Sequence, residues 1–99
     1  MIFKEYETFV QSHRIYPAEQ TIMYPILALC GEAGELANEY KKIMRDGRSG
    51  SYSPEERERM LLEAGDVLWY LTAVAKDLGS SLEEIAEKNM TKLSMRRAK

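Results

Sequence analysis

The stretch IMYPILALCGEAGELANEYKKIMRDG, residues 22–47, decides the fold class of this chain. Its apolar residues recur every three or four positions, which is the spacing of one face of a helix: Ile26, Leu29, Ala33, Leu36, Ala37, Tyr40, Ile43 and Met44. Pro25 falls in the first turn, where a proline is tolerated, and Gly47 stands where helices commonly end. The pattern therefore predicts one long helix over residues 22–46.

Three further segments carry the same helical period, over residues 2–13, 54–78 and 82–96. No segment alternates between apolar and polar residues with a period of two, so we expect no strand. No repeat, low-complexity tract or long linker divides the 99 residues, and a chain of that length has room for one domain. We predict an all-α fold, a four-helix bundle that forms a single domain over residues 1–99.

Two of the helix starts carry capping signals. Ser53, followed by Pro54 and by Glu56 three residues on, is typical of a capping box with proline in the first turn. Ser81 and Glu84 repeat the same spacing before the last helix. These residues define where the third and fourth helices begin.

Charge and composition exclude several classes of function. The chain has 14 Lys and Arg against 16 Asp and Glu, and a net charge of −2 gives no general attraction for nucleic acid or an anionic membrane. No apolar run is long enough to span a membrane. The lone Cys30 forms no internal disulfide, so we expect a cytoplasmic protein with a buried thiol there. Small bundles gain stability by assembling, which favours a homodimer or homotetramer.

Two pairs of carboxylates stand out, Glu32 with Glu35 and Glu63 with Asp66. Residues three apart share one helix face, and each pair borders the apolar face of its helix. If those faces pack together, four carboxylates converge and repel one another unless a cation binds. Oxygen ligands suit Mg²⁺ or Mn²⁺ far better than Zn²⁺. The alternative is that these acids are solvated helix edges paired with Lys or Arg.

A glycine precedes the second acid of each pair, in EAGE (Gly34) and in EAGD (Gly65). Glycine inside a helix costs roughly 1 kcal/mol relative to alanine. That cost, incurred twice at matching places, predicts that the two helices approach each other closely there.

The strings YPILALCGEAGELANEYKKIMRDG and LLEAGDVLWYLTAVAKDLGSSLEEIAEKNMTKLSMRRAK resemble the MazG-like nucleoside triphosphate pyrophosphohydrolases, especially their compact phage-type branch. The resemblance runs from about Tyr16 to the end of the chain. It implies an all-α enzyme that uses Mg²⁺ to hydrolyse a nucleoside or deoxynucleoside triphosphate to the monophosphate and pyrophosphate, in nucleotide-pool housecleaning. It also implies that four residues hold the metal: Glu32, Glu35, Glu63 and Asp66.

The chain departs from the family pattern at two places. Many members carry a second Glu at the start of the first motif, where this chain has Gly31, so either Glu32 or Glu35 could activate the attacking water. Phage-type members often continue into a glycine-rich tail, whereas this sequence stops at RRAK. Both departures favour the alternative function, a catalytically silent helical binding or scaffold module.

On the substrate side, the resemblance implies that Asn89, Lys92 and Arg96 face the nucleotide through the pattern N-x-x-K-L-x-x-R. Asn89 could instead be a buried structural amide, and Lys92 and Arg96 could be favourable charges near a helix C-terminus. Lys42 is a further candidate cation, or part of a solvated face. Tyr70, four residues after Asp66, could stack on the base, or belong to the core or an oligomer contact.

The aromatic residues before the second helix form a last group of candidates. Tyr16 and Tyr24, with the loop around Pro17, could cover the base. We expect Trp69 to be a core or interface residue, and His13 to be a capping or packed residue at the end of the first helix.

Overall fold

The computed structural model describes residues 1–97, and the only regular elements in that part of the chain are helices. The α-helices are α1 (Phe3–Ser12), α2 (Met23–Arg45), α3 (Pro54–Asp77) and α4 (Leu82–Arg97), with a short 3₁₀ helix, η1 (Ala18–Gln20), between the first two. The predicted all-α class is confirmed, and each helix begins and ends within one residue of its predicted limit. None of the helices described is long and apolar enough to cross a lipid bilayer.

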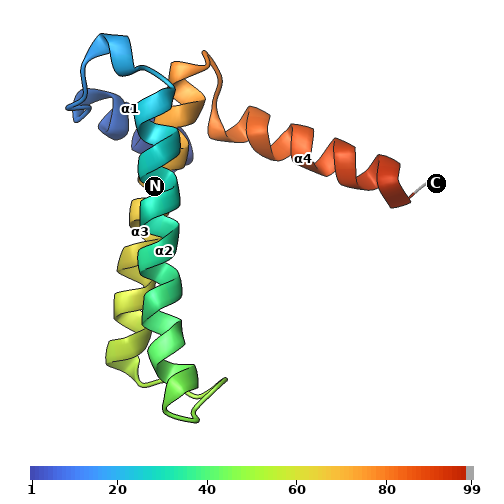
Figure 1. Ribbon diagram of the computed structural model, residues 1–99. Coiled ribbons are helices and arrows are strands. Elements are labelled where there is room, and N and C mark those ends of the chain that lie inside the picture. The colour runs from blue at the N-terminus through green and yellow to red at the C-terminus, as the bar shows by residue number, and fades with distance from the viewer. Residues whose placement is uncertain (98–99) are drawn as a thin grey trace.

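The centre of the fold is the antiparallel pair α2 and α3, which forms the most extensive helix contact (Figure 1). α1 packs against α3 near the end of the pair that lies opposite the connecting loop, and there Val10 is fully buried. The other buried apolar side chains come from all three later helices: Ile43, Ala73, Ala75 and Leu82. This small core holds α1, α2 and α3 in fixed register.

The start of α3 has the predicted capping box. The Ser53 hydroxyl accepts a hydrogen bond from the Glu56 amide at 3.1 Å, and the Glu56 carboxylate accepts one from the Ser53 amide at 2.8 Å. Arg48 donates two more bonds to the same carboxylate, at 2.9 and 2.7 Å. These hydrogen bonds lower the pKa of Glu56 to about 2, and those from Arg48 make the largest contribution. The loop between α2 and α3 is therefore closed by a charged, bidentate pair.

The start of α4 has only half of its predicted box. The Ser81 hydroxyl accepts a hydrogen bond from the Glu84 amide at 3.0 Å. The Glu84 carboxylate, however, accepts from the hydroxyl of Ser80 rather than from the backbone of Ser81. The neighbouring serine thus competes for the carboxylate and leaves the reciprocal bond unmade.

α4 points away from the other helices and does not close a bundle within one chain (Figure 1). Leu82 in its first turn is buried, but Met90 is 69% exposed and Met95 is 62% exposed. The radius of gyration is 16.2 Å, whereas a compact chain of this length has about 13 Å. Most of α4 is therefore exposed in the single chain, which differs from the predicted bundle.

Two local predictions about α2 and α3 are wrong in this chain. Cys30 is exposed, because no other helix covers the edge of α2 that also carries the half-exposed Ile26. Gly34 and Gly65 do not mark a close approach of the helices, since a Cβ atom at either position would meet no atom within 4 Å. The two helices pack through their larger side chains instead.

Candidate functional site

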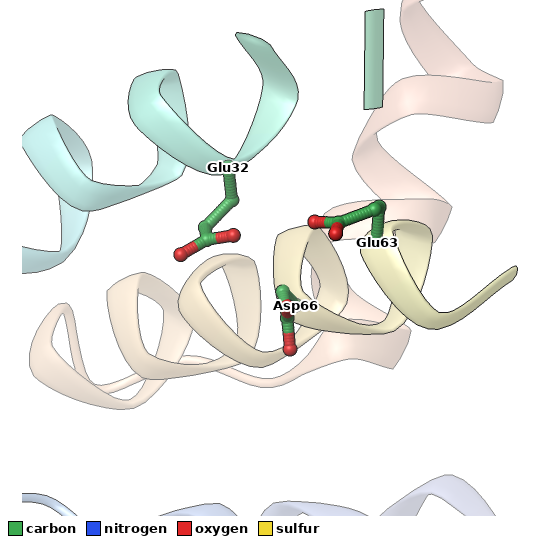
Figure 2. Close-up of side chains that lie close together, drawn as sticks. All are labelled: Glu32, Glu63 and Asp66. Atoms are coloured by element: carbon green, nitrogen blue, oxygen red, sulfur yellow. The ribbon is translucent and has the colours of Figure 1, made fainter. Parts of the chain in front are cut away.

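Three of the four predicted metal ligands come together between α2 and α3. One carboxylate oxygen each of Glu32, Glu63 and Asp66 lies within 4.8 Å of the others. Figure 2 shows Glu32 extending from α2 toward α3, where Glu63 and Asp66 stand one turn apart. The antiparallel packing of two helices, each with acids at a spacing of three, is what places these groups together. We call these three residues the carboxylate cluster.

Glu35, the fourth predicted ligand, lies outside this cluster. Its side chain is exposed on α2, one turn beyond Glu32. It is still close enough for its negative charge to help raise the pKa of Glu63. The structure therefore places Glu35 beside the carboxylate cluster but not in it.

The carboxylate cluster carries uncompensated negative charge. Partial burial raises the pKa of Glu63, and the charges of Asp66, Glu32, Glu35 and Glu39 raise it further. Within residues 1–97, none of the three cluster acids forms the ion pair with Lys or Arg that the alternative interpretation expects.

Two other acids on the same two helices, unlike those of the cluster, are compensated by arginines. Glu39 pairs with Arg59 at 3.2 Å, and Glu56 pairs with Arg48 at 2.7 Å. Three unpaired carboxylates at short range are the donor set that a hard divalent cation prefers. The residues present therefore fit Mg²⁺ or Mn²⁺.

A pocket of about 290 Å³ adjoins the carboxylate cluster and shares two of its acids, Glu32 and Asp66. The remaining lining residues are mostly aromatic: His13, Ile15, Tyr16, Tyr24, Trp69 and Tyr70. A larger hollow of about 890 Å³ lies between α1 and the start of α4, but none of the carboxylate cluster lines it. The smaller pocket is therefore the one of the two that adjoins the carboxylate cluster.

The aromatic side chains of the small pocket are arranged in two pairs. The rings of Tyr16 and Tyr24 stack at 4.8 Å with 15° between their planes. Trp69 and Tyr70 meet edge to face at 5.0 Å. Burial raises the pKa of Tyr70, as do nearby Tyr24 and the charges of Glu32 and Asp66, so its phenol keeps its proton at neutral pH. Flat apolar faces and a neutral hydroxyl suit a planar, heterocyclic group.

Trp69 and His13 also line the pocket, a position that was predicted for neither of them. Trp69, predicted to be a core or interface residue, is half-buried in the single chain and lines the pocket. His13 ends α1 as predicted, with Nδ1 2.8 Å from the carbonyl oxygen of Phe9, and it lines the pocket as well.

The predicted cationic and amide residues are not brought to this pocket by the single chain. Asn89, Lys92 and Arg96 lie on the exposed part of α4, and none of them lines the pocket. Asn89 is therefore not the buried structural amide of the alternative interpretation. Lys42 is exposed on α2, ten residues beyond Glu32, or about 15 Å along the helix.

The sequence analysis missed Asp77 and Arg14. The Asp77 side chain is fully buried, and its carboxylate accepts hydrogen bonds from the Tyr16 hydroxyl at 2.9 Å and the Ile22 amide at 2.8 Å. Arg14 forms an ion pair with it at 2.7 Å. A signal was present in the sequence, because an acid in the last turn of a helix opposes the helix dipole and calls for another reason to be there.

Comparison with known proteins agrees with this geometry. The family model described as the MazG nucleotide pyrophosphohydrolase domain matches residues 20–99, which include the whole carboxylate cluster. The Gene 37 protein of Mycobacterium phage L5 is 35% identical over 98 residues, which cover 93% of this chain and 85% of the phage protein. No solved structure matches the chain. Since the family model spans most of its length, the chain belongs to the family of MazG nucleotide pyrophosphohydrolase domains.

Proposed function

We propose that this protein hydrolyses a nucleoside or deoxynucleoside triphosphate to the monophosphate and pyrophosphate, with Mg²⁺ as cofactor, in nucleotide-pool housecleaning. The observation that carries the proposal is the carboxylate cluster of Glu32, Glu63 and Asp66, unpaired and next to an aromatic pocket. Family membership supports the same reaction. A cation site beside a pocket for a flat ring is the arrangement that a nucleotide requires.

The three cluster residues would hold the cation, and Mn²⁺ would satisfy the same oxygen ligands. When bound, the cation would neutralise charge on the triphosphate and lower the pKa of a water molecule. Glu32 would bind the cation from α2, and Glu63 and Asp66 would bind it from α3, so the site would form only when the two helices pair.

We assign the role of general base to Glu35. Gly31 offers no carboxylate, and Glu32 is engaged with the cluster, so Glu35 is the remaining acid of the first motif. It lies beside the cluster and is exposed to water. In this role its carboxylate would accept the proton of the water that attacks the α-phosphorus, and the bond from that phosphorus to the bridging oxygen would break to release pyrophosphate.

The aromatic pocket would hold the base. The Tyr16 and Tyr24 pair and the Trp69 and Tyr70 pair offer ring faces and edges for stacking, and the protonated Tyr70 hydroxyl can donate a hydrogen bond. Glu32 and Asp66 belong to both the pocket and the cluster. With the base in the pocket, the phosphate chain would begin beside these two acids. One ligand can therefore occupy both parts of the site.

We further propose that the protein acts as a homodimer or homotetramer. Its accessible surface is 7386 Å², whereas a compact monomer of 11.4 kDa exposes about 5,800 Å². Large apolar side chains on three helices contribute to the excess: Met23, Leu27, Leu61, Leu62, Met90, Leu93 and Met95. Assembly would cover them, and would also let Asn89, Lys92 and Arg96 on α4 reach the triphosphate of a neighbouring chain.

The test is product analysis by ³¹P NMR with a panel of common and deaminated nucleoside triphosphates, with Mg²⁺ and with EDTA. The proposal expects a monophosphate and pyrophosphate in the presence of Mg²⁺ only. Release of orthophosphate and a diphosphate would contradict it.

The alternative is a catalytically silent helical binding or scaffold module of the same fold. Gly31, in place of the acid common in the family, and the unpacked α4 favour it. It predicts that no triphosphate is hydrolysed by protein whose helical fold is verified by circular dichroism. It also predicts that Glu35→Gln changes nothing beyond helix stability.

A further inference from the structure

We propose that Asp77 is a positioning residue for the nucleotide pocket: it fixes the segment of residues 14–22 so that Tyr16 and Tyr24 form a wall beside the carboxylate cluster. The proposal rests on the proposed function and deepens it, because it names what shapes the pocket. Asp77 itself does not line the pocket. Its effect on substrate must therefore pass through the residues that it holds.

The Asp77 carboxylate gathers three groups from that segment. Oδ2 accepts hydrogen bonds from the Tyr16 hydroxyl at 2.9 Å and from the Ile22 amide at 2.8 Å. Oδ1 lies 2.7 Å from Nη2 of Arg14, an ion pair without hydrogen-bond alignment. The Asp77 side chain is fully shielded from solvent, and Arg14 is the cation that compensates its charge. Losing the carboxylate would release all three groups together.

The position of Asp77 at the end of α3 has an electrostatic reason. α2 and α3 are antiparallel, so the last turn of α3 lies beside the first turn of α2 (Figure 1). An acid is unfavourable at the C-terminus of its own helix, but favourable at the N-terminus of a neighbouring one. Ile22, the N-cap of α2, has no side-chain cap of its own, and Asp77 accepts a hydrogen bond from the Ile22 amide, as the acid of a capping box would.

The backbone of the segment needs this anchor. Ile22 has φ 73° and ψ −56°, and no other residue except glycine has a positive φ within residues 1–97. A β-branched residue is strained in that region and stays there only where its surroundings hold it. The hydrogen bond from the Ile22 amide to Asp77 is the contact that does so. It fixes the direction in which the chain enters α2.

The same anchor sets the aromatic wall. Tyr16 is held through its hydroxyl, and its ring stacks on Tyr24. The guanidinium of Arg14, itself held by Asp77, lies 4.8 Å from the centre of the Tyr16 ring. Both tyrosines line the pocket together with Glu32 and Asp66. Arg14 and Tyr16 precede the residues that the family model matches, whereas Tyr24 lies within them, so the segment before the matched domain supplies half of this wall.

The test compares Asp77→Asn with a matched control, Glu56→Gln. The control removes a carboxylate that also binds an arginine, but at the other end of α3, about 30 Å away. For Asp77→Asn we expect KM to rise about tenfold while kcat stays within about threefold, because ground-state positioning is lost and the cluster is intact. Tyr16→Phe, which keeps the ring, should raise KM in the same direction by less. Glu56→Gln should leave KM unchanged.

Two readouts need no turnover. Trp69, the one tryptophan of the chain, lines the same pocket, so acrylamide should quench its fluorescence more strongly in Asp77→Asn. Trypsin should also cut faster after Arg14, whose side chain is only 24% exposed in its ion pair. If no triphosphate is hydrolysed by the wild type, the proposed function fails, while these two readouts still decide whether Asp77 holds the wall.

Three results would overturn the proposal. One is a fall in kcat with KM unchanged in Asp77→Asn. Another is that Glu56→Gln raises KM as much as Asp77→Asn does, since general destabilisation would then explain both. The third is unchanged Trp69 quenching and trypsin cleavage in Asp77→Asn. If that variant does not fold, as judged by circular dichroism, Tyr16→Phe decides by the same measurements, and an unchanged KM and quenching there would contradict the proposal.

Discussion

Glu32 on α2 and Glu63 on α3 bring carboxylate oxygens within 4.8 Å of each other, and no cationic group of residues 1–97 is paired with either. Two like charges at this range destabilise the folded chain unless a proton or a metal ion binds. The repulsion between Glu32 and Glu63 therefore makes the stability of the fold depend on both metal binding and pH.

Mg²⁺ is expected to stabilise the protein. A ligand at ten times its Kd adds about 1.4 kcal/mol, which raises the Tm of a domain of this size by about 5–10 °C. Thermal unfolding followed by circular dichroism, with Mg²⁺ and with EDTA, measures the shift. Asp66→Asn should abolish it and Glu56→Gln should retain it; an equal shift in all three proteins would place the cation elsewhere.

Glu35→Gln should separate catalysis from metal binding. If Glu35 is the base and not a ligand, the variant loses activity by about 10²- to 10⁴-fold and keeps the Mg²⁺-dependent rise in Tm. Asp66→Asn should lose both. Parallel measurement of pyrophosphate release and thermal unfolding gives the comparison, and loss of the Mg²⁺ shift in Glu35→Gln would make Glu35 a ligand.

Glu63→Gln should stabilise the metal-free protein at neutral pH. The pKa of Glu63 is raised in the fold, by burial first and then by the neighbouring acids, so the folded state binds its proton more tightly than the unfolded chain does. The resulting stability is fully present below the unfolded pKa and is lost as pH rises through the folded one. Glutamine imitates the protonated form and removes that loss.

Urea unfolding in EDTA at several pH values tests this prediction. The wild type should lose stability relative to Glu63→Gln as pH rises from the ordinary pKa of a glutamate through the raised pKa of Glu63, because the carboxylate loses its proton over this range. Glu56→Gln serves as the control, since its carboxylate is stabilised in the charged form. A Glu63→Gln variant less stable than wild type at pH 7 would mean that an unseen cationic partner holds the Glu63 carboxylate.

Gly65→Ala should stabilise the chain by about 0.5–1 kcal/mol, because alanine loses less conformational entropy in a helix and Gly65 has open space around it. Urea unfolding at neutral pH measures the change. A loss of stability would instead show that a second chain packs against this glycine in solution.

The helices and the carboxylate cluster could be predicted because local rules determine them. The apolar spacing around Ile43 and the Ser53 capping box define helix limits, and the spacing from Glu63 to Asp66 places both acids on one face. These features depend on residues within about two turns of each other.

The remaining features depend on contacts between segments that are far apart in the sequence. The spacing of apolar residues does not indicate which of these segments meet. Asp77 meets Tyr16 across 61 positions of the chain, and an acid in the last turn of a helix indicates that a partner is needed without indicating which residue it is. Cys30 has the spacing of a core residue, yet it is exposed because no helix covers that edge of α2. α4 has the length and cap of a bundle helix, but its direction follows from the turn at Gly79, where φ is 70°.

The measurement that tests the central claim most directly is the rate of pyrophosphate release from the best triphosphate of the panel. It is followed across a Mg²⁺ titration in wild type, Asp66→Asn and Glu56→Gln. The account predicts release that rises with Mg²⁺ and vanishes in EDTA, that falls at least about 100-fold in Asp66→Asn, and that is unchanged in Glu56→Gln. Release that is independent of Mg²⁺, or equal in Asp66→Asn and wild type, would contradict the assignment of the carboxylate cluster as the catalytic metal site.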